Sequence, residues 1–273
     1  MRKDNHEEMK EFFFYYYSRK EEDYFSINGV HNRCQLPCEV DHPYSWSNIP
    51  FKELNDMDRS KKYKWAVFGC SITFGQHIAR KDTWPHIFEE KINTPVLNFG
   101  TPGSGIDGIW QNIKISHKEW QYENIIIVFP NFHRRMASIK INDFYLRWPV
   151  VVNNSHPTPW DWGHYSDPIG SGLNLDPKLI DKKSEKVLRE IVEDKDSTYS
   201  KSILDQIIDF CESNFRSCFY ATWDIDVGEY LKQKSIKFDR YDITGPKASD
   251  GIHPTRFQNK KFVDTISSRI LTD

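Results

Sequence analysis

The sequence predicts a three-layer α/β/α sandwich, in which helices cover both faces of a parallel sheet of about five strands. Short apolar runs rich in β-branched and aromatic residues alternate with longer segments whose apolar residues recur at helical spacing. The strongest run, Asn-Ile-Ile-Ile-Val-Phe at 124–129, is continuously apolar after its first residue, which is typical of a strand covered on both faces. Regular alternation of strand and helix favours parallel pairing, because each helix returns the chain to the same end of the sheet.

Each strand is expected to coincide with a clear apolar run. Trp-Ala-Val-Phe is ended by Gly69, and Pro-Val-Leu-Asn-Phe leads into the glycine-rich segment 100–108. A sheet of this kind is expected to be flavodoxin-like in its strand order. The predicted strands cover 65–68, 95–99, 124–129, 217–222 and a segment near 236–242.

Helices are expected between these strands. The first is near 83–92, with Asp82 or Thr83 as its N-cap and Pro85 in its first turn. Others are expected from the glycine-rich segment to about 118, over 200–215 and near 227–234. The last helix is expected to begin at Pro254, with an apolar stripe made of Phe257, Phe262, Ile266 and Ile270.

The chain divides into an N-terminal extension over 1–60 and a main domain over 61–273. The extension lacks clear periodicity, and we expect it to pack on the main domain, with a helix over 6–19. Within the main domain, 133–199 interrupts the strand–helix rhythm and is rich in Pro, Gly, Trp and His. A connection of this length is usually functional, so the insertion is expected to form a lid or a wall of the substrate site.

Composition limits the possible partners. The formal net charge is −2, which gives no electrostatic reason to expect a nucleic-acid partner. No apolar run approaches the roughly 20 residues that a membrane-spanning helix needs. The aromatic run at 12–17 is too short for a signal-peptide core, so we expect a cytoplasmic protein or one released by a route that needs no signal.

Cysteine usage argues against a disulfide scaffold, since the five cysteines are an odd number in a long chain. Cys34 and Cys38 have the spacing of half a zinc site, but no second Cys/His pair stands at a matching spacing. We therefore expect no metal and no organic cofactor.

The residues that follow the predicted strands carry the chemistry, because open parallel sheets bind ligands at the carboxyl ends of their strands. A serine hydroxyl becomes a good nucleophile when a base takes its proton, and a histidine held by a carboxylate is suited to that task. Ser71 follows the first strand, and Asp250 and His253 are close together before the last helix. The segments in question are Gly-Cys-Ser-Ile-Thr-Phe-Gly at 69–75, 98–105, 130–134 and Asp-Gly-Ile-His-Pro at 250–254.

In this order and spacing the four segments resemble the four sequence blocks of the SGNH (GDSL-type) hydrolase family, over about 64–134 and 200–271. The resemblance implies that Ser71, Asp250 and His253 form a catalytic triad. It also implies an oxyanion hole made by the backbone N–H groups of Ser71 and Gly103 and by the side-chain amide of Asn131.

Two departures from the family pattern stand next to these residues. Cys70 occupies the position where the family usually has Asp, and we interpret it as a packed small side chain. Pro130 and Phe132 replace the Gly and Asp that usually flank the third-block Asn, so the loop around Asn131 is expected to follow a path of its own.

Each candidate also has a structural interpretation. Ser71 could cap the helix that follows it, and Asn131 could satisfy loop backbone. His253 could be a surface residue of a polar turn. His133 and Arg134, followed by Arg135, are either a solvated charge cluster or a source of positive potential for an anionic substrate.

Rival enzyme classes lack a necessary part. Gly103-Ser-Gly-Ile-Asp-Gly108 matches the dinucleotide-binding pattern, but no carboxylate follows at the end of the next strand, where the ribose would be held. We instead attribute these glycines to a close backbone approach to a reacting group. The sequence contains neither a phosphate-binding G-x-x-x-x-G-K-[ST] loop nor a G-x-S-x-G nucleophile elbow.

The sequence thus predicts a serine esterase that hydrolyses short acyl esters, with acetyl groups on carbohydrate favoured. Trp160 and Trp162 are candidate stacking residues for sugar rings, whereas Trp65 and Trp110 are expected in the core. Two alternatives remain open. One is a catalytically inactive carbohydrate-binding protein on the same scaffold, and the other is a sugar O-acyltransferase that uses the same triad.

Overall fold

The computed structural model of the chain describes residues 58, 60–75, 78, 80–101, 104–141, 144–151, 186, 196–247 and 253–270. Almost all of the N-terminal extension, including the helix expected over 6–19, lies outside these residues. So does the part of the insertion that contains Trp160 and Trp162.

Within the described residues, five parallel strands form the main sheet. Their order, β2-β1-β3-β6-β7, is the flavodoxin-like order in which the first strand lies between the second and the third. This confirms the predicted sheet. The strands are β1 (Lys62–Gly69), β2 (Val96–Gly100), β3 (Gln121–Phe129), β6 (Ser217–Thr222) and β7 (Phe238–Arg240).

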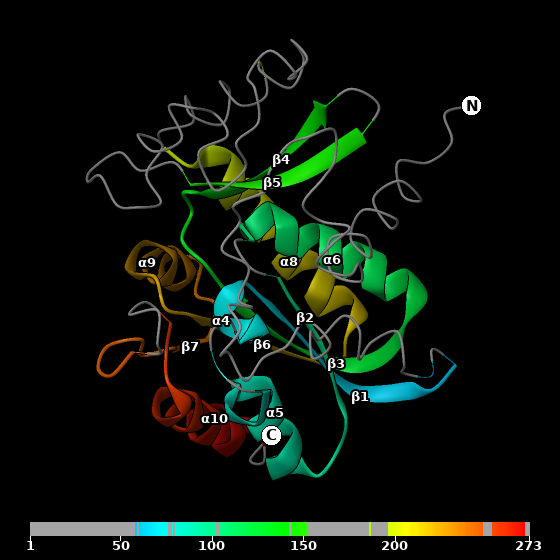
Figure 1. Cartoon of the computed structure of the whole chain (residues 1–273), viewed down its shortest axis with the longest axis vertical. Helices are drawn as coiled ribbons and strands as arrows, with labels where there is room; N and C mark the ends of the chain where they lie inside the picture. The colour runs from blue at the N-terminus through cyan, green and yellow to red at the C-terminus, as the bar shows by residue number, and fades with distance from the viewer. Residues whose placement is uncertain are drawn as a thin grey trace.

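Helices cover both faces of this sheet, as predicted (Figure 1). The helices α6, α8 and α9 pack on one face, and α5 and α10 pack on the other. Their bounds are α4 (Ser71–Phe74), η2 (Arg80–Asp82), α5 (Trp84–Ile92), α6 (Ile106–Glu119), α8 (Thr198–Asn214), α9 (Ile225–Gln233) and α10 (Arg256–Ile270).

Successive strand residues supply the two halves of the core. In β3, Ile125 and Ile127 pack against α6 and α8, while Ile126 and Val128 pack against α5 and α10. Because side chains alternate between the two faces of a strand, a strand buried on both faces must be apolar at every position. Trp65 is buried in the α5/α10 layer as expected, and Trp110 is partly buried against the α6/α8 layer.

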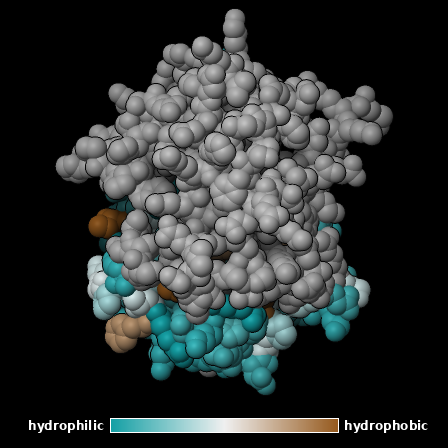
Figure 2. Space-filling model, in the orientation of Figure 1, coloured by the Kyte–Doolittle hydropathy of each residue, from teal (hydrophilic) through white to brown (hydrophobic). Residues whose placement is uncertain are grey.

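The described surface is more hydrophilic than the core. Figure 2 shows the described part of one face as mostly hydrophilic, with hydrophobic residues at separate points. The exposed large hydrophobic side chains among the described residues are Tyr199, Ile225 and Phe257. No described helix is long and apolar enough to cross a bilayer.

The start of the insertion is more regular than we predicted. The strands β4 (Arg134–Ile141) and β5 (Phe144–Val151) form an antiparallel hairpin, with Arg134 opposite Val151 and Ile141 opposite Phe144. The hairpin lies above α6 and α8 in Figure 1. The sequence signal is present in the alternating Ser-Ile-Lys-Ile and Phe-Tyr-Leu-Arg-Trp segments, which Asn142 and Asp143 separate.

The last helix also differs from the prediction. It begins at Arg256 instead of Pro254, and Phe257 is 69% exposed, so Phe257 does not belong to its buried stripe. The buried stripe begins instead with the polar residues Gln258 and Asn259 and continues with Phe262, Val263, Ile266 and Ser267. An apolar pattern alone therefore misplaced the first turn of this helix.

Two glycines let α4 lie directly on the ends of β1 and β2. A Cβ atom at Gly100 would lie 2.4 Å from the backbone nitrogen of Phe74, and one at Gly69 would lie 2.1 Å from Oγ1 of Thr73. The side-chain amide of Asn98 also donates a hydrogen bond to the carbonyl oxygen of Thr73, at 3.2 Å. The helix that begins with Ser71 is therefore held against the carboxyl end of the sheet.

We expect Gly100→Ala to lower the free energy of unfolding by about 2 kcal/mol or more, because the added methyl group meets backbone, which cannot rotate away as a side chain can. Gly228→Ala in α9 is the matched control. Its Cβ would lie 3.4 Å from the ring of Phe238, an ordinary contact distance. Alanine should stabilise that helix by about 0.5–1 kcal/mol. Urea unfolding followed by circular dichroism measures both, and equal stability of Gly100→Ala and wild type would contradict the tight contact.

Candidate active site

Ser71 is the first residue of α4, directly after the carboxyl end of β1. Cys70 is the N-cap of this helix, and the cap has no side-chain hydrogen bond. The interpretation of Ser71 as a helix cap is therefore wrong, and its hydroxyl remains a candidate nucleophile. Ser71 is buried, with 5% of its surface exposed. Cys70 is fully buried with a free thiol, as expected for a packed side chain.

The register of the sheet sets which residues surround Ser71. Gly69, the last residue of β1, lies opposite Gly100 of β2 on one side and Val128 of β3 on the other. The N–H of Thr101 donates to the carbonyl oxygen of Gly69 at 3.0 Å, so the two chains leave the sheet side by side. The segments that follow β2 and β3 therefore flank Ser71, as the position of the candidates after their strands predicts.

The chain that leaves β2 is held at its first residue. The side-chain amide of Asn112, on α6, donates to Oγ1 of Thr101 at 2.9 Å and to the carbonyl oxygen of Phe99 at 3.3 Å. The N–H of Ser104 then donates to the carbonyl oxygen of Thr101 at 3.1 Å. Gly103, a predicted oxyanion-hole residue, lies outside the described residues. Its role stays a prediction, although the described residues on either side of it are bonded to each other.

At Gly105, the residue before α6, the glycine-rich segment packs closely against the start of β4. A Cβ atom there would lie 2.1 Å from the backbone carbonyl oxygen of Arg134. The close approach at this glycine is therefore to the chain at the start of β4. This corrects our attribution of the glycines to a close approach to a reacting group, at least for Gly105.

Asn131 lies in a tight turn between β3 and β4. The N–H of Arg134 donates to the carbonyl oxygen of Asn131 at 3.4 Å. Phe132 anchors the turn, since it is buried edge-on against Tyr230 with ring centroids 5.6 Å apart. The hydroxyl of Ser200 donates to the carbonyl oxygen of Phe132 at 2.9 Å. These contacts hold the turn from two helices.

The side chain of Asn131 does not brace this turn through its oxygen. Its Oδ1 atom is buried and has no hydrogen-bond partner among the described residues. Buried polar atoms without partners are rare in folded proteins, and each needs an explanation such as a ligand or a water. A ligand or a water that donates a hydrogen bond would satisfy this oxygen.

Trp223 and Asp224 are residues that our sequence reasoning missed. They follow β6, and Thr222 ties them to β3 because its hydroxyl donates to the carbonyl oxygen of Phe129 and accepts from the N–H of Asp224, both at 3.0 Å. Asp224 is the N-cap of α9, where its carboxylate accepts from the N–H of Val227 at 3.0 Å. Burial raises its pKa above the usual value for Asp. Their position after a central strand is the signal that could have found them.

The arginines after Asn131 do not form a solvated cluster. The Nε atom of Arg135 lies 3.4 Å from the carboxylate of Asp107, and its guanidinium lies 3.8 Å from the ring centroid of Tyr199. The guanidinium of Arg134 lies 5.3 Å from the ring centroid of Trp223. Both side chains are partly buried. The solvated interpretation is therefore wrong for these two residues.

His253 lies just before α10 and is buried, with 8% of its surface exposed. It is therefore not a surface residue of a polar turn. Lys247 and Pro254 form an antiparallel bridge, which holds together the two described ends of the segment containing His253 and Asp250. Asp250 itself lies outside the described residues, so its place in the triad stays a prediction.

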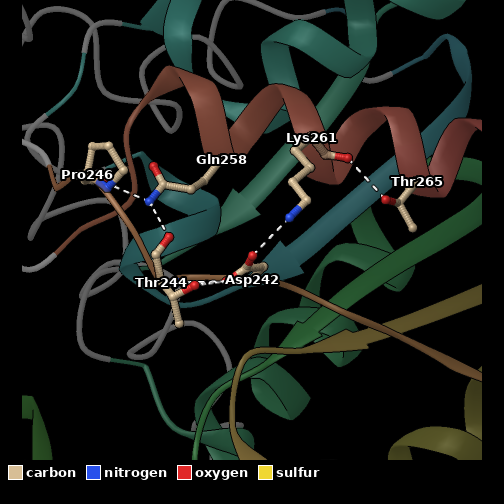
Figure 3. Close-up of polar contacts among 6 residues, drawn as sticks. All are labelled: Asp242, Thr244, Pro246, Gln258, Lys261 and Thr265. Atoms are coloured by element: carbon tan, nitrogen blue, oxygen red, sulfur yellow. Dashed lines mark hydrogen bonds and ion pairs between the residues drawn. The ribbon is translucent and has the colours of Figure 1, made fainter.

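Gln258 clamps the same segment from α10 (Figure 3). Its Nε2 atom donates to the carbonyl oxygens of Thr244, at 2.8 Å, and Pro246, at 2.7 Å. Its Oε1 atom accepts from the N–H of Thr255 at 2.8 Å. One buried side chain therefore joins both sides of the segment that carries His253.

A second link joins this loop to α10 at the surface. The ammonium of Lys261 lies 3.0 Å from the carboxylate of Asp242, which also accepts a hydrogen bond from the hydroxyl of Thr244 (Figure 3). The hydrogen bond from Thr244, with that from Lys261, lowers the pKa of Asp242 below its usual value. Exposed ion pairs of this kind contribute about 0–1 kcal/mol to stability, so Gln258 is the main clamp.

The start of α10 is also tied to the segment that follows α4. The side-chain amide of Asn259 donates to the carbonyl oxygen of Asp82 at 2.8 Å, and the guanidinium of Arg256 lies 2.9 Å from the Asp82 carboxylate. Thr83 packs directly against Gly75, the C-cap of α4. The helix next to the expected base and the helix that begins with the expected nucleophile thus contact two neighbouring residues, Asp82 and Thr83.

The described residues include part of the predicted site. Ser71, Asn131, His133, Arg134 and His253 are described, and each follows a strand or precedes α10 as predicted. Gly103, Asp250, Trp160 and Trp162 lie outside the described residues. Among the residues that are described, no group of three or more His, Cys, Asp or Glu side chains could hold a metal ion. Cys34 and Cys38 also lie outside.

No protein-family model and no curated protein matches the sequence. Several solved structures to which the chain is similar are members of the GDSL or SGNH hydrolase family. One is a lipolytic protein of the G-D-S-L family from Veillonella parvula, with 13% identity, a TM-score of 0.41 and coverage of 77% of this chain and 98% of that one.

Two further structures are a GDSL-like lipase and an acetyl xylan esterase. The lipase, from Bacteroides thetaiotaomicron, has 10% identity, a TM-score of 0.43 and coverage of 81% of this chain and 95% of that one. The esterase, from Butyrivibrio proteoclasticus, has 11% identity, a TM-score of 0.38 and coverage of 76% of this chain and 64% of that one.

We expect Gln258→Ala to lower the free energy of unfolding by about 1–3 kcal/mol, because the substitution removes several hydrogen bonds of one buried side chain. Lys261→Ala is the control on the same helix and the same loop, and it should cost less than about 1 kcal/mol. Urea unfolding of the two variants makes the comparison. Equal losses would show that Gln258 is not the main clamp.

Proposed function

We propose that this chain is a serine esterase of the SGNH type that hydrolyses short acyl esters. One observation carries the proposal. Ser71 is buried at the carboxyl edge of the parallel sheet, its possible role as a helix cap is taken by Cys70, and Asn131 follows β3, the strand that pairs with β1. A serine in this position, with a buried His253 before α10, is suited to acyl transfer.

In the first step, the hydroxyl oxygen of Ser71 attacks the ester carbonyl carbon while His253 takes the hydroxyl proton. The carbonyl oxygen becomes an oxyanion in the tetrahedral intermediate. The bond to the alcohol oxygen then breaks, and His253 gives its proton to the leaving alcohol. Ser71 is left acylated, and Asp250 orients the imidazole and stabilises its protonated form.

The oxyanion requires hydrogen-bond donors that are already in place. The proposed donors are the N–H groups of Ser71 and Gly103 and the side-chain amide of Asn131. The rigid turn around Asn131 supports this role, since Phe132 and Ser200 hold it independently of any ligand. A backbone held in this way keeps the attachment point of the proposed donor in place when charge develops.

In the second step, water attacks the acyl carbon while His253 takes a proton from that water. The bond to Ser71 breaks, the serine oxygen recovers its proton from His253, and the carboxylic acid leaves. No metal or organic cofactor is required by either step. For substrate we propose short acyl groups, such as acetyl, carried by a carbohydrate.

Ser71→Ala should reduce the hydrolysis of p-nitrophenyl acetate by at least about 1,000-fold, because the acyl-enzyme can no longer form. His253→Ala should have a similar effect, and Asn131→Ala should lower kcat by about 100-fold or more through loss of one oxyanion donor. Spectrophotometric release of p-nitrophenolate measures all three, with folding checked by circular dichroism.

Cys70→Ala is the matched control, because it removes the neighbouring thiol and leaves the hydroxyl of Ser71 in place. It should keep most of the activity. Full activity in a folded Ser71→Ala variant would disprove the proposed nucleophile. Loss of activity in Cys70→Ala alone would point to a thiol enzyme instead.

Trp160→Ala or Trp162→Ala should lower turnover of an acetylated glycan at least tenfold more than turnover of p-nitrophenyl acetate, because only the glycan offers sugar rings for stacking. Acetate release measures the first activity and p-nitrophenolate release measures the second. Equal effects on the two substrates would disprove a role of these tryptophans in carbohydrate binding.

A further inference from the structure

Two arginines follow Asn131 closely, and one of them faces a carboxylate. Arg135 pairs with Asp107. Arg134 has no carboxylate partner within the described part of the chain and lies instead over the ring of Trp223. Its charge is partly withdrawn from water, which is costly unless an anion or a hydrogen-bond acceptor compensates it.

Two buried donors of this contact have no acceptor. The Nε–H of Arg134 and the Nε1–H of Trp223 are both buried, and neither has a hydrogen-bond partner among the described residues. A buried donor without an acceptor costs about 1–3 kcal/mol, and more when the group is charged. Because the two groups meet in one guanidinium–indole contact, a single molecule with two acceptor oxygens could satisfy both of them.

This contact lies close to the proposed reaction centre. Arg134 closes the turn that begins at Asn131, because its N–H donates to the Asn131 carbonyl oxygen. Trp223 follows Thr222, which lies opposite Phe129 in the sheet and is hydrogen-bonded to it. Trp223 is thus the first residue after β6, and Arg134 is five residues after the end of β3, the strand that precedes the proposed oxyanion donor Asn131.

We propose that Arg134 and Trp223 form a subsite for a carboxylate of the substrate, so that the preferred substrate is an acyl ester of an acidic saccharide. This inference rests on the proposed function. A carboxylate offers two acceptor oxygens in a plane, which matches the planar guanidinium, and a charge-assisted hydrogen bond is about twice as strong as a neutral one. The indole N–H adds a second donor, and no covalent step is involved.

The first experiment compares substrates with the wild-type chain. Chemically acetylated polygalacturonate carries one carboxylate on each sugar, and acetylated glucomannan carries none. We expect kcat/KM for acetate release to be at least tenfold higher for the first at low salt. The ratio should shrink as sodium chloride is added, because salt screens a partly exposed ion pair. Equal kcat/KM values for both polymers at low salt would argue against a carboxylate on the saccharide.

The second experiment tests Arg134 directly. Arg134→Gln should lower kcat/KM for acetylated polygalacturonate at least tenfold more than kcat/KM for p-nitrophenyl acetate, and Arg134→Lys should fall between it and wild type. Lys114→Met is the matched control. It removes another cation that lies over a tryptophan, with its ammonium 5.0 Å from the ring centroid of Trp110, and it should leave the preference unchanged. Equal losses of Arg134→Gln on both substrates would overturn the proposal.

The carboxylate could also belong to the acyl group. Comparison of mono-p-nitrophenyl succinate with p-nitrophenyl butyrate separates this source from the saccharide. An Arg134-dependent preference for the succinate alone would move the anion to the acyl side of the same subsite. No Arg134-dependent preference in either pair would mean that water alone satisfies the two donors, and the proposal would be wrong.

A binding measurement separates failure of this inference from failure of the proposed function. Calorimetric titration of the wild-type chain with unesterified oligogalacturonate needs no catalysis. At least tenfold weaker binding by Arg134→Gln would support the subsite even in a protein that hydrolyses no ester. Absence of binding by wild type, together with active hydrolysis of p-nitrophenyl acetate, would overturn the subsite and leave the esterase proposal in place.

Discussion

The backbone of α4 lies directly on the end of β2, with no room between them for a side chain at Gly100. The position of Ser71 depends on this contact, because Ser71 is the first residue of α4. The contact also sets where the neighbouring chain leaves the sheet, since the register ends β1 and β2 at the same level and Thr101 bonds back to Gly69. Gly100, which has no side chain, therefore allows the contact that positions the helix beginning with Ser71.

The parallel sheet could be predicted from the sequence because its strands are buried on both faces. Residues such as Ile125 and Ile126 point to opposite layers, so the run remains apolar throughout. The β4–β5 hairpin could not be predicted in the same way. Pro149 lies inside β5, and a proline normally argues against a strand because it cannot donate to a ladder. In the described residues β5 pairs only with β4, so its other side needs no donor at that position.

The positions of Ser71 and Asn131 in the fold followed from the sequence, since both stand directly after strands whose carboxyl ends share one edge. The residues that hold the site did not follow. Gln258 and Asn259 occupy the buried stripe of α10 where apolar residues were expected, and Phe257 lies outside it. Their burial is explained by the backbone groups that they bond, which belong to segments distant in the sequence. A pattern of apolar residues carries no information about such contacts.

The same tertiary contacts explain why the proposed site can be ready before a substrate arrives. An apolar residue at position 258 would pack against the sheet, but it could not bond the carbonyl oxygens of the loop that precedes His253. Similarly, the pairing of Arg135 with Asp107 attaches the start of the hairpin to α6. The neighbouring Arg134 lies over the ring of Trp223. Groups held in this way lose little freedom on binding or reaction, which is the physical advantage of a preorganised site. The cost of burying these polar residues is thus offset by the hydrogen bonds and ion pairs that hold the segments of the proposed site together.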